Sequence, residues 1–395
     1  MSLPPLILKK NEDRRLRAGH LWVFSNEVDI TRSPLKGFEP GDLVEIQAAN
    51  GHVIGTGYVN PNSLISARIL SRDPRHQPDR SLLVHRLNIA LALRERLYPR
   101  PFYRLVFGES DGLPGLTVDR YDQVLVAQIT TAGMERMKPD VVAALEKVIK
   151  PAAILLRNDT GIRELEGLPL YTETALGTVP DVAGVEEHGL SFQVPLAAGQ
   201  KTGWFFDQYA NRARLLPYVK QQRVLDVCSY VGGWGVQAAA HGASSVTCVD
   251  SSAAALEWAG RNAAANSVQL TLKDADAFDA LKELREAGEK FGVAVLDPPA
   301  FVKRRKDLAA GSEAYRRLNQ LAMQVLERDG MLISCSCSHH MPAEDLLAGI
   351  QSAARHLGRD AQVLEQGMQA PDHPVHPAIP ETAYLKAFYV RVVTP

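Results

Sequence analysis

Two short segments near the C-terminal end of the sequence hold residue types that can do covalent chemistry on a flat nitrogenous base. The first is the D-P-P step at residues 297–299, which follows an apolar run. Its prolines lack backbone N–H groups and have fixed φ angles, so the turn can present the carboxylate of Asp297 and backbone carbonyls to a base. The second segment holds Cys335 and Cys337, which are two residues apart and therefore share one face of a strand.

A cysteine beside such a turn suits methylation of a pyrimidine at carbon 5. Carbon 5 is not nucleophilic enough to take a methyl group unaided, whereas a thiolate that adds to carbon 6 makes it enamine-like. A base then removes the carbon-5 proton, and the thiolate is eliminated. We predict Cys337 as the nucleophile, because it is nearest the strand end, and Cys335 as a structural or supporting residue. Cys228 and Cys248 are expected to pack in the interior, as free cysteines often do.

Two alternative chemistries fit these residues less well. Amino-group methyltransferases typically place an aromatic residue directly after the two prolines, and here Ala300 precedes Phe301. Metal binding by the two cysteines and two histidines of residues 335–340 is disfavoured, because neighbouring ligands on one strand cannot easily surround a tetrahedral ion. Their spacing also matches no common zinc pattern, so we predict no metal site.

From about residue 220 strands and helices alternate, and these elements must position the two segments. Runs typical of buried strands occur at 223–227, 245–250, 268–272, 293–297 and 331–338. Helical spacing is found at 253–266 and 313–326. Strands that alternate with helices of this length predict an α/β fold of Rossmann type, with a mainly parallel sheet covered on both faces. Ligands bind at the carboxyl ends of the strands in such sheets.

A glycine-rich turn at residues 228–235 joins the first of these strands to a helix. Its glycines allow a tight turn and a close approach to a ligand. The turn lacks the GxGxxG spacing of dinucleotide-binding enzymes, which disfavours a nicotinamide oxidoreductase.

Carboxylates stand at or just after four successive strand ends, and they are Asp226, Asp250, Asp276 and Asp297. A single aspartate at such a position would more simply cap a helix. Four of them with a D-P-P step resemble the class I S-adenosylmethionine methyltransferases. Asp250 is then expected to accept hydrogen bonds from a ribose diol, and Asp276 to lie near an adenine amino group. The expected cofactor site also includes Ser229, Tyr230, Gly232 and Ala277.

The sequence before residue 190 divides into two smaller parts. Short alternating segments between Gly, Pro and Asn turns predict a β-rich domain over residues 1–72. The polar stretch 71–80 contains two prolines and is typical of a linker. Strand-like and helical runs over residues 73–190 predict a central α+β domain. The methyltransferase domain is expected to span residues 191–395.

Composition excludes several classes of protein. With 46% apolar and 23% charged residues, the chain is neither disordered, collagen-like nor a disulfide scaffold. The net charge of −1 hides an imbalance: residues 1–105 carry 16 Lys or Arg against 10 Asp or Glu, and the remainder carries 28 against 35. The N-terminal excess favours an anionic partner.

Two groups of basic residues are candidate RNA contacts. They are the first basic cluster, Arg14, Arg15 and Arg17, and the second basic cluster, Lys303, Arg304 and Arg305. The first precedes Trp22 and Phe24, a mixture that suits phosphate contacts and base stacking. The second follows the D-P-P step and is placed to steer phosphates toward the catalytic edge. A solvated charged surface is the alternative interpretation of both.

The sequence predicts a cytoplasmic protein with reduced thiols. Its four cysteines lack a regular disulfide spacing, and its N-terminal apolar run is too short for a signal peptide. No stretch approaches the length of a membrane-spanning helix, so no membrane partner is expected.

Longer motifs extend the resemblance to one family over essentially the whole chain. They are GHLWVFSNEV (19–28), PGD (40–42), GESDGLPGLTVDRY (108–121), GQKTGWFFDQYANR (199–212), DPPAF (297–301), SCS (336–338) and DHPVHPAIPETAYLK (372–386). On these motifs the chain is identified as a member of the large-subunit ribosomal RNA cytosine-C5 methyltransferase I family.

This resemblance implies an RNA-binding PUA domain, which is a small β-barrel, followed by a small central domain and an S-adenosylmethionine methyltransferase domain. It implies methylation of one cytosine in 23S ribosomal RNA, with Cys337 as nucleophile and Asp297 hydrogen-bonded to the target base. It also implies that four residues of the GQKTGWFFDQ segment lie beside the cofactor, namely Lys201, Thr202, Phe205 and Asp207. Cys335 departs from the family, where an apolar or aromatic residue is usual, and this leaves open which thiol attacks.

Several questions stay open at this point. The residues do not identify the target nucleotide or the base that removes the carbon-5 proton. They do not distinguish naked RNA from an assembly intermediate as substrate, and the oligomeric state is open, with a homodimer as one alternative. An amino-group methyltransferase acting on RNA or DNA, and a non-catalytic RNA-binding assembly factor that keeps the fold, are the alternative functions.

Overall fold

The structure is a computed structural model that describes residues 3–73, 76, 78–196 and 202–395. It divides into two compact units. The first unit contains the described residues up to Ala183 together with Pro195–Phe206 and Asp372–Thr382, and the second contains Gly184–Val194, Asp207–Pro371 and Ala383–Pro395.

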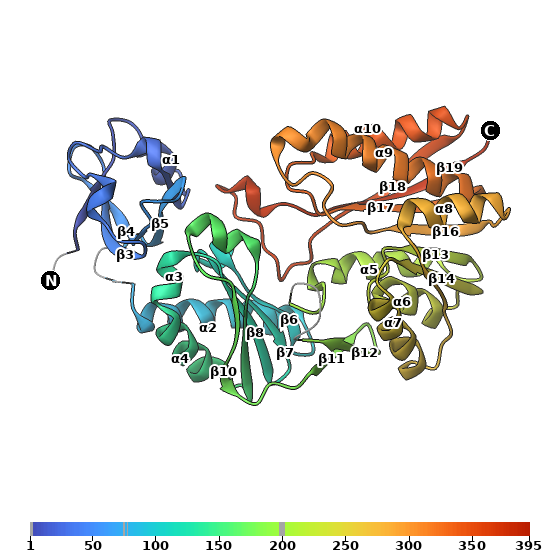
Figure 1. Cartoon of the computed structure of the whole chain (residues 1–395), viewed down its shortest axis with the longest axis horizontal. Helices are drawn as coiled ribbons and strands as arrows, with labels where there is room; N and C mark the ends of the chain where they lie inside the picture. Colours follow the sequence, from blue (N-terminus) through green and yellow to red (C-terminus); the bar gives the residue numbers. More distant parts are fainter. Residues whose placement is uncertain (1–2, 74–75, 77, 197–201) are drawn as a thin grey trace. The chain divides into compact units, whose positions relative to one another are not determined.

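The first unit is built on two five-stranded sheets (Figure 1). One has the order β1-β3-β4-β5-β2, with strands Pro5–Ile7, Asp42–Gln47, Val53–Val59, Ile65–Ser71 and Trp22–Phe24. The other has the order β10-β9-β8-β7-β6, with strands Tyr171–Gly177, Ala153–Asn158, Val124–Ile129, Leu116–Tyr121 and Phe102–Phe107. The main helices of this unit are α1 (Arg14–Arg17), α2 (Arg80–Leu97), α3 (Ala132–Arg136) and α4 (Lys138–Ile149).

Segments distant in sequence complete the first unit. Ile379 is fully buried in the apolar core of the first sheet, beside residues such as Val23 and Ile46. Arg94 is fully buried and donates to the carboxylate of Asp111, at 2.6 and 2.8 Å, and to the backbone carbonyl of Asp372 at 2.7 Å. The segment 372–382 is therefore anchored in this unit by both apolar and ionic contacts.

The second unit is built on a seven-stranded sheet within the described residues. Its order is β15-β14-β13-β16-β17-β19-β18, with strands Thr271–Asp274, Ser245–Asp250, Arg223–Val227, Phe291–Leu296, Leu326–Ser336, Lys386–Val393 and Asp360–Met368. The first five strands are parallel, and β19 is antiparallel to both of its neighbours. A hairpin of β11 (Val182–Glu187) and β12 (Leu190–Pro195) precedes the sheet in the chain.

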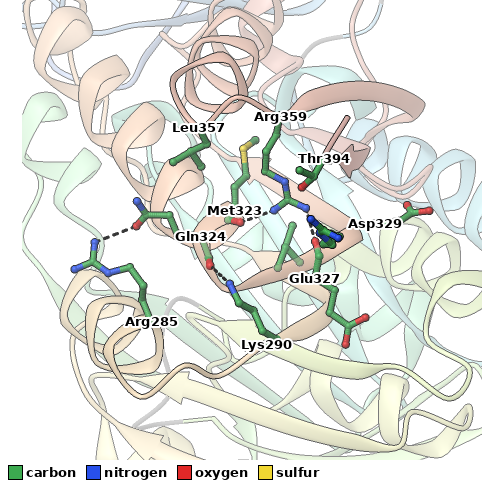
Figure 2. Close-up of a pocket in the computed structure, with 11 residues that line it drawn as sticks. Arg285, Lys290, Met323, Gln324, Glu327, Asp329, Leu357, Arg359 and Thr394 are labelled. Carbon is green, nitrogen blue, oxygen red and sulfur yellow. Dashed lines mark hydrogen bonds between the residues drawn. The ribbon is translucent and has the colours of Figure 1, made fainter.

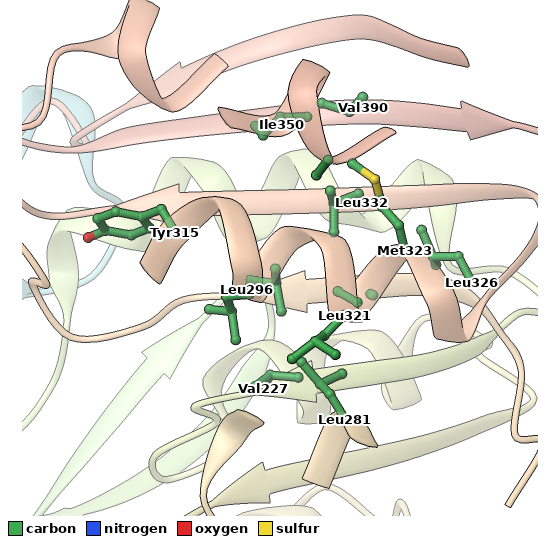
Figure 3. Packing of buried hydrophobic residues seen from close by; sticks show 14 of the residues in the cluster. Val227, Leu281, Leu296, Tyr315, Leu321, Met323, Leu326, Leu332, Ile350 and Val390 are labelled. Atoms are coloured by element: carbon green, nitrogen blue, oxygen red, sulfur yellow. The ribbon is translucent and has the colours of Figure 1, made fainter. Parts of the chain in front are cut away.

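Helices cover both faces of this sheet, and alternate residues of each strand face opposite sides. The helices are α5 (Tyr209–Leu215), α6 (Gly233–Ala240), α7 (Ala253–Ala265), α8 (Ala277–Glu286), α9 (Leu308–Val325) and α10 (Ala343–His356). Val224 packs in the core with α5, α6 and α7, whereas Leu225 packs in the core with α8, α9 and α10. Figure 3 shows part of the second core, where Leu332 of the sheet lies near Met323 of α9.

The predicted α/β fold class is confirmed, and most predicted elements are present. The strand predicted at 268–272 was wrong at its start: β15 begins at Thr271, and the Val268 N–H instead donates to the carbonyl of Ala263 near the end of α7. The strand predicted at 331–338 ends earlier, at Ser336, so Cys337 lies just beyond it. Part of the predicted linker, at residues 74, 75 and 77, lies outside the described residues. In the part of the chain that is described, no helix has both the length and the apolar character needed to cross a membrane.

Leu332 provides a test of the packing around α9 and α10. It is fully buried, so Leu332→Ala is expected to lower the free energy of unfolding by about 2–5 kcal/mol, because it leaves a cavity. Leu364→Ala is the matched control: Leu364 is 47% exposed on β18, and its loss should change stability by less than about 0.5 kcal/mol. Urea unfolding followed by circular dichroism measures both, and equal effects would contradict the assigned core.

Candidate active site

The turn after β13 holds its backbone in an uncommon conformation. Cys228, Tyr230 and Gly232 all have positive φ angles, of 65°, 50° and 85°. Each non-glycine residue in this region costs on the order of 1 kcal/mol or more, and such strain persists only where the surroundings enforce it. Here the Cys228 N–H donates to the Val249 carbonyl at 2.9 Å, and the Tyr230 N–H donates to Asp250 at 2.8 Å. The neighbouring strand β14 therefore holds the turn open.

Asp226, near the end of β13, also stabilises this turn. It is fully buried, and its Oδ2 accepts a hydrogen bond from the Gly235 N–H at 2.9 Å, near the start of α6. Burial, together with the charge of Asp297, raises the pKa of Asp226 to about 8. Two buried polar atoms at this turn, Asp226 Oδ1 and Ser229 Oγ, have no hydrogen-bond partner within the described residues. They are free to meet a polar ligand.

Asp250 and Asp276 both accept hydrogen bonds from backbone N–H groups. Asp250 Oδ1 accepts from Ser252 at 2.9 Å, and the exposed Asp276 caps α8 by accepting from Phe278 at 2.8 Å. The capping interpretation therefore holds for Asp276. A carboxylate has about four acceptor positions, so capping leaves room for contacts to a ligand. Ala277, the first residue of α8, is half-buried beside this cap.

The D-P-P carboxylate is held from two sides. Period-two alternation along β16 turns Asp297 toward the face covered by α5 and α6. Its Oδ1 accepts from Gln208 Nε2 and its Oδ2 from Trp234 Nε1, both at 3.0 Å. Gln208 is itself held by Asn211, whose amide donates to Gln208 Oε1 at 2.7 Å. Burial raises the pKa of Asp297.

Gln208 and Trp234 were not predicted as site residues. Both belong to motifs that the sequence analysis singled out, the GQKTGWFFDQ segment and the glycine-rich turn. That membership was the available signal, whereas their convergence on one carboxylate depends on the tertiary fold.

A buried ion pair lies in the same region of the second unit. Arg212 and Glu187 are both buried and make two hydrogen bonds, at 2.5 and 2.7 Å. The charges of Asp207 and Asp297 also act on Arg212 and help to raise its pKa, against the effect of burial. Asp207 accepts a hydrogen bond from the Tyr384 hydroxyl at 2.5 Å. This arginine therefore compensates part of the negative charge around the D-P-P step.

Cys337 reaches the D-P-P step from the neighbouring strand. It follows the last residue of β17, it is half-buried, and its Sγ lies 4.0 Å from the carbonyl oxygen of Pro298. The strand ends thus bring together the two segments that the sequence analysis selected for covalent chemistry.

The other three cysteines are poorly placed to form thiolates. Cys335 and Cys248 are fully buried in the core with α5, α6 and α7, and burial raises the pKa of each well above its usual range. Burial and the nearby carboxylates, Asp250 foremost, also raise the pKa of Cys228. Because the thiolate is the nucleophilic form, these environments disfavour attack by all three.

The predicted basic clusters are partly neutralised by their own neighbours. Arg15 pairs with Glu27 at 2.8 Å and lies over the Phe24 ring, and Arg17 pairs with Asp13 at 2.5 Å. In the second basic cluster, Arg304 pairs with Asp307 at 3.0 Å. Three members are exposed and form no ion pair with a described acidic residue, namely Arg14, Lys303 and Arg305.

Three predicted residues of the GQKTGWFFDQ segment are not placed with the strand-end carboxylates. Lys201 lies outside the described residues. Thr202 and Phe205 belong to the first unit, where the Thr202 hydroxyl bonds to Asp119 and the Thr202 carbonyl accepts from the Tyr121 hydroxyl at 3.0 Å. Their assignment to the cofactor site stays a prediction.

A cavity of about 750 Å³ lies at the opposite, amino-terminal edge of the same sheet (Figure 2). Two of its cations donate to backbone carbonyls at the end of α9: Lys290 Nζ to Gln324 and Arg359 to Met323, each at 2.6 Å. Cations are favourable at a helix C-terminus, so these two side chains have a structural role in capping α9. Among the described residues, no three His, Cys, Asp or Glu side chains are grouped closely enough to hold a metal ion.

Comparison with known proteins agrees with this geometry. The family described as S-adenosylmethionine-dependent methyltransferase matches residues 167–391, and a PUA-like domain matches residues 6–72. Curated relatives named ribosomal RNA large subunit methyltransferase I align over almost the whole chain. The one from Tolumonas auensis is 38% identical and the one from Aliivibrio fischeri strain MJ11 is 39% identical, with 98% of this chain and 98–99% of the relative covered.

The chain belongs to the ribosomal RNA large subunit methyltransferase I family.

Solved structures support the fold of this methyltransferase. SMU.776, a methyltransferase complexed with SAH, superposes with a TM-score of 0.84 at 20% identity and covers 98% of this chain and 100% of its own. A methyltransferase from Streptococcus mutans superposes with a TM-score of 0.82 at 19% identity, over the same fractions. The predicted family, fold class and cofactor, S-adenosylmethionine, are confirmed.

The raised pKa of Asp226 predicts a specific dependence of stability on pH. An aspartate in the unfolded chain has a pKa near 4, and the folded value is about 8. The folded state therefore holds a proton that the unfolded state releases, so this contribution is complete below pH 4 and is lost as pH rises toward 8. Asp226→Asn should make the free energy of unfolding fall less steeply between pH 5 and 8, by at most about 1.4 kcal/mol per pH unit.

Urea unfolding at a series of pH values measures this difference. Asp274→Asn, which changes an exposed carboxylate at the end of β15, is the control and should keep the wild-type slope. An equal slope in Asp226→Asn and wild type would show that Asp226 is ionised in the folded protein.

Proposed function

We propose that this methyltransferase transfers a methyl group from S-adenosylmethionine to carbon 5 of a cytosine in 23S ribosomal RNA, through a covalent bond between Cys337 and carbon 6. The observation that carries the proposal is the 4.0 Å approach of the Cys337 sulfur to the carbonyl of Pro298. It joins a nucleophile to the D-P-P step within one site. The names of the curated relatives support large-subunit ribosomal RNA as the substrate class.

The residues of this chain have distinct parts in the reaction. The Cys337 thiolate adds to carbon 6 and is later eliminated when the carbon-5 proton leaves. Asp297 is held by hydrogen bonds from Gln208 and Trp234, and in this proposal it hydrogen-bonds the target cytosine. Cys335 is buried in the core, which supports Cys337 as the attacking thiol.

The strand ends fit the cofactor in charge and in shape. S-adenosylmethionine, when bound, supplies the methyl group on a positively charged sulfur. Asp250 at the end of β14 and Asp297 just after β16 give this edge negative charge, which favours a cationic ligand. The unpartnered atoms of Asp226 and Ser229 and the open turn through Tyr230 and Gly232 offer it polar contacts. We assign Asp250 to the ribose, Asp276 and Ala277 to the adenine, and Asp207 with Lys201, Thr202 and Phe205 to the same site.

The first unit is proposed to bind RNA. A cavity of about 620 Å³ is lined by Arg17, His52 and Arg72 among others, and these side chains suit phosphate oxygens. The exposed Arg14 lies on the same short helix as Arg17. This surface belongs to the segment that matches a PUA-like domain.

Three further proposals concern the organisation of the protein. We propose the domains 1–72, 73–190 and 191–395, a cytoplasmic location and, as one option for assembly, a homodimer. Size-exclusion chromatography with light scattering tests the last.

Methylation by cysteine variants tests the proposed reaction. Wild type and Cys335→Ala should form 5-methylcytosine in 23S ribosomal RNA from cells that lack the gene, whereas Cys337→Ala should lose activity by at least 10³-fold, because no other placed thiol replaces it. Bisulfite sequencing locates the product. The proposal would be overturned if the product were methylated on an exocyclic amino group, or if Cys337→Ala kept full activity. Failure to bind S-adenosylmethionine in calorimetry would favour the alternative of a non-catalytic RNA-binding protein.

The second basic cluster gives a prediction about RNA affinity. Lys303 and Arg305 are exposed, so Lys303→Ala/Arg305→Ala should remove two phosphate contacts and lower the slope of log affinity against log salt by about 1.4. Arg261→Ala, which removes an exposed arginine of α7 that pairs with Glu257, is the control and should leave the slope unchanged. Filter binding between 50 and 200 mM salt measures both, and identical slopes in all proteins would exclude the cluster from RNA binding.

A further inference from the structure

The two serines that flank Cys337 are buried and tied to one phenol. The Ser336 hydroxyl donates to the Tyr315 oxygen at 2.9 Å, and Tyr315 and Ser338 are joined through their hydroxyls at 3.0 Å. The Val302 N–H adds a hydrogen bond to Ser338 Oγ at 3.1 Å. Helix α9, which carries Tyr315, and the loop after the D-P-P step therefore hold the backbone on both sides of the half-buried thiol.

Lys386 holds the same backbone from the other side. It is the first residue of β19, where it pairs in register with Ser336, and it is 9% exposed. Its Nζ donates to the Ser338 carbonyl at 2.6 Å and to the Tyr384 carbonyl at 2.9 Å. A lysine thus reaches past the strand end to the peptide that follows Cys337.

The surroundings of Lys386 favour the protonated, positively charged form of its side chain. Carbonyl oxygens only accept hydrogen bonds, and the ammonium form offers three N–H donors against two in the neutral amine, so contact with two carbonyls suits the charged form. Burial lowers the pKa of Lys386 to about 8, while the charges of Cys337 and Glu344 act in the opposite direction. At neutral pH the side chain is therefore mainly cationic and interacts with the sulfur of Cys337.

We propose that Lys386 is a positioning residue for Cys337: its ammonium group fixes the Ser338 carbonyl and favours the thiolate form of the neighbouring cysteine. An opposite charge close to a thiol is a general means of raising the thiolate fraction. The inference rests on the proposed function, in which Cys337 is the nucleophile. It gives a role to Lys386, the last residue of the motif at 372–386, to which the sequence analysis assigned none.

Other ionisable groups surround this pair. They are Tyr315 of α9, Cys335 of β17, Glu344 of α10 and the two histidines that follow, His339 and His340. Burial raises the pKa of Tyr315 and of Cys335, so both stay neutral near pH 7.

The pH dependence of Cys337 alkylation tests the proposal without RNA. Iodoacetamide labelling of the Cys337 peptide is measured by mass spectrometry in the full-length wild type and in Lys386→Met, Lys386→Gln and Lys386→Arg. Met removes the donor and the charge, Gln keeps a donor without charge, and Arg keeps the charge. We expect the midpoint of the labelling curve to rise by about one pH unit in the Met and Gln variants, and labelling near pH 7 to be about tenfold slower. In the Arg variant the midpoint should return toward the wild-type value.

Tyr315→Phe is the matched control, because it removes hydrogen bonds to both serines but no charge. Its midpoint should equal that of wild type. The proposal would be overturned if Lys386→Met and Lys386→Gln both kept the wild-type midpoint of labelling. It would also be overturned if the midpoint rose equally in Tyr315→Phe and Lys386→Arg, because the change would then come from the geometry of the loop. Failure of the proposed function has a different signature: Cys337→Ala would keep methylating RNA while the Lys386 variants still shifted the labelling curve.

Discussion

The site depends on the parallel pairing of β16 with β17. In this register Leu296 lies opposite Ser334, and β17 continues for two residues after β16 has ended. Cys337 therefore emerges beyond the sheet at the level of the D-P-P step and reaches the Pro298 carbonyl. A shift of one residue would turn Cys337 to the other face and bring the wrong side chain to that edge. The two apolar cores fix the register, because alternate residues of each strand are buried against different helices.

The same edge gathers carboxylates, and their mutual repulsion is a cost that the fold must offset. Asp226 and Asp297 are both desolvated, and the pKa of each is raised. Gly235, Gln208 and Trp234 donate hydrogen bonds to them. The buried Arg212, paired with Glu187, acts on the same region. Carboxylates and buried polar atoms without hydrogen-bond partners destabilise this edge of the sheet. They also complement a cationic cofactor, as expected at a site where function takes precedence over stability.

The sequence predicted the fold class, the cofactor edge and the pairing of two segments for clear reasons. Alternating strands and helices of regular length determine a parallel sheet, and such a sheet places every carboxyl strand end at one edge. It did not predict Gln208, Trp234 or Lys386, because their roles depend on contacts between residues far apart in the chain. Lys386 acts on Cys337 only because β19 inserts antiparallel beside β17, which no local pattern reveals.

The most direct test of the account is the identity of the covalently bound residue. Incubation of the protein and S-adenosylmethionine with large-subunit ribosomal RNA that contains 5-fluorocytosine should trap the adduct, since fluorine at carbon 5 cannot leave as a proton does. After nuclease and protease digestion, mass spectrometry should find the nucleotide on the peptide of Cys337, with the bond on that sulfur. A nucleotide on Cys335 or Cys228, or methylated RNA with no adduct, would contradict the account.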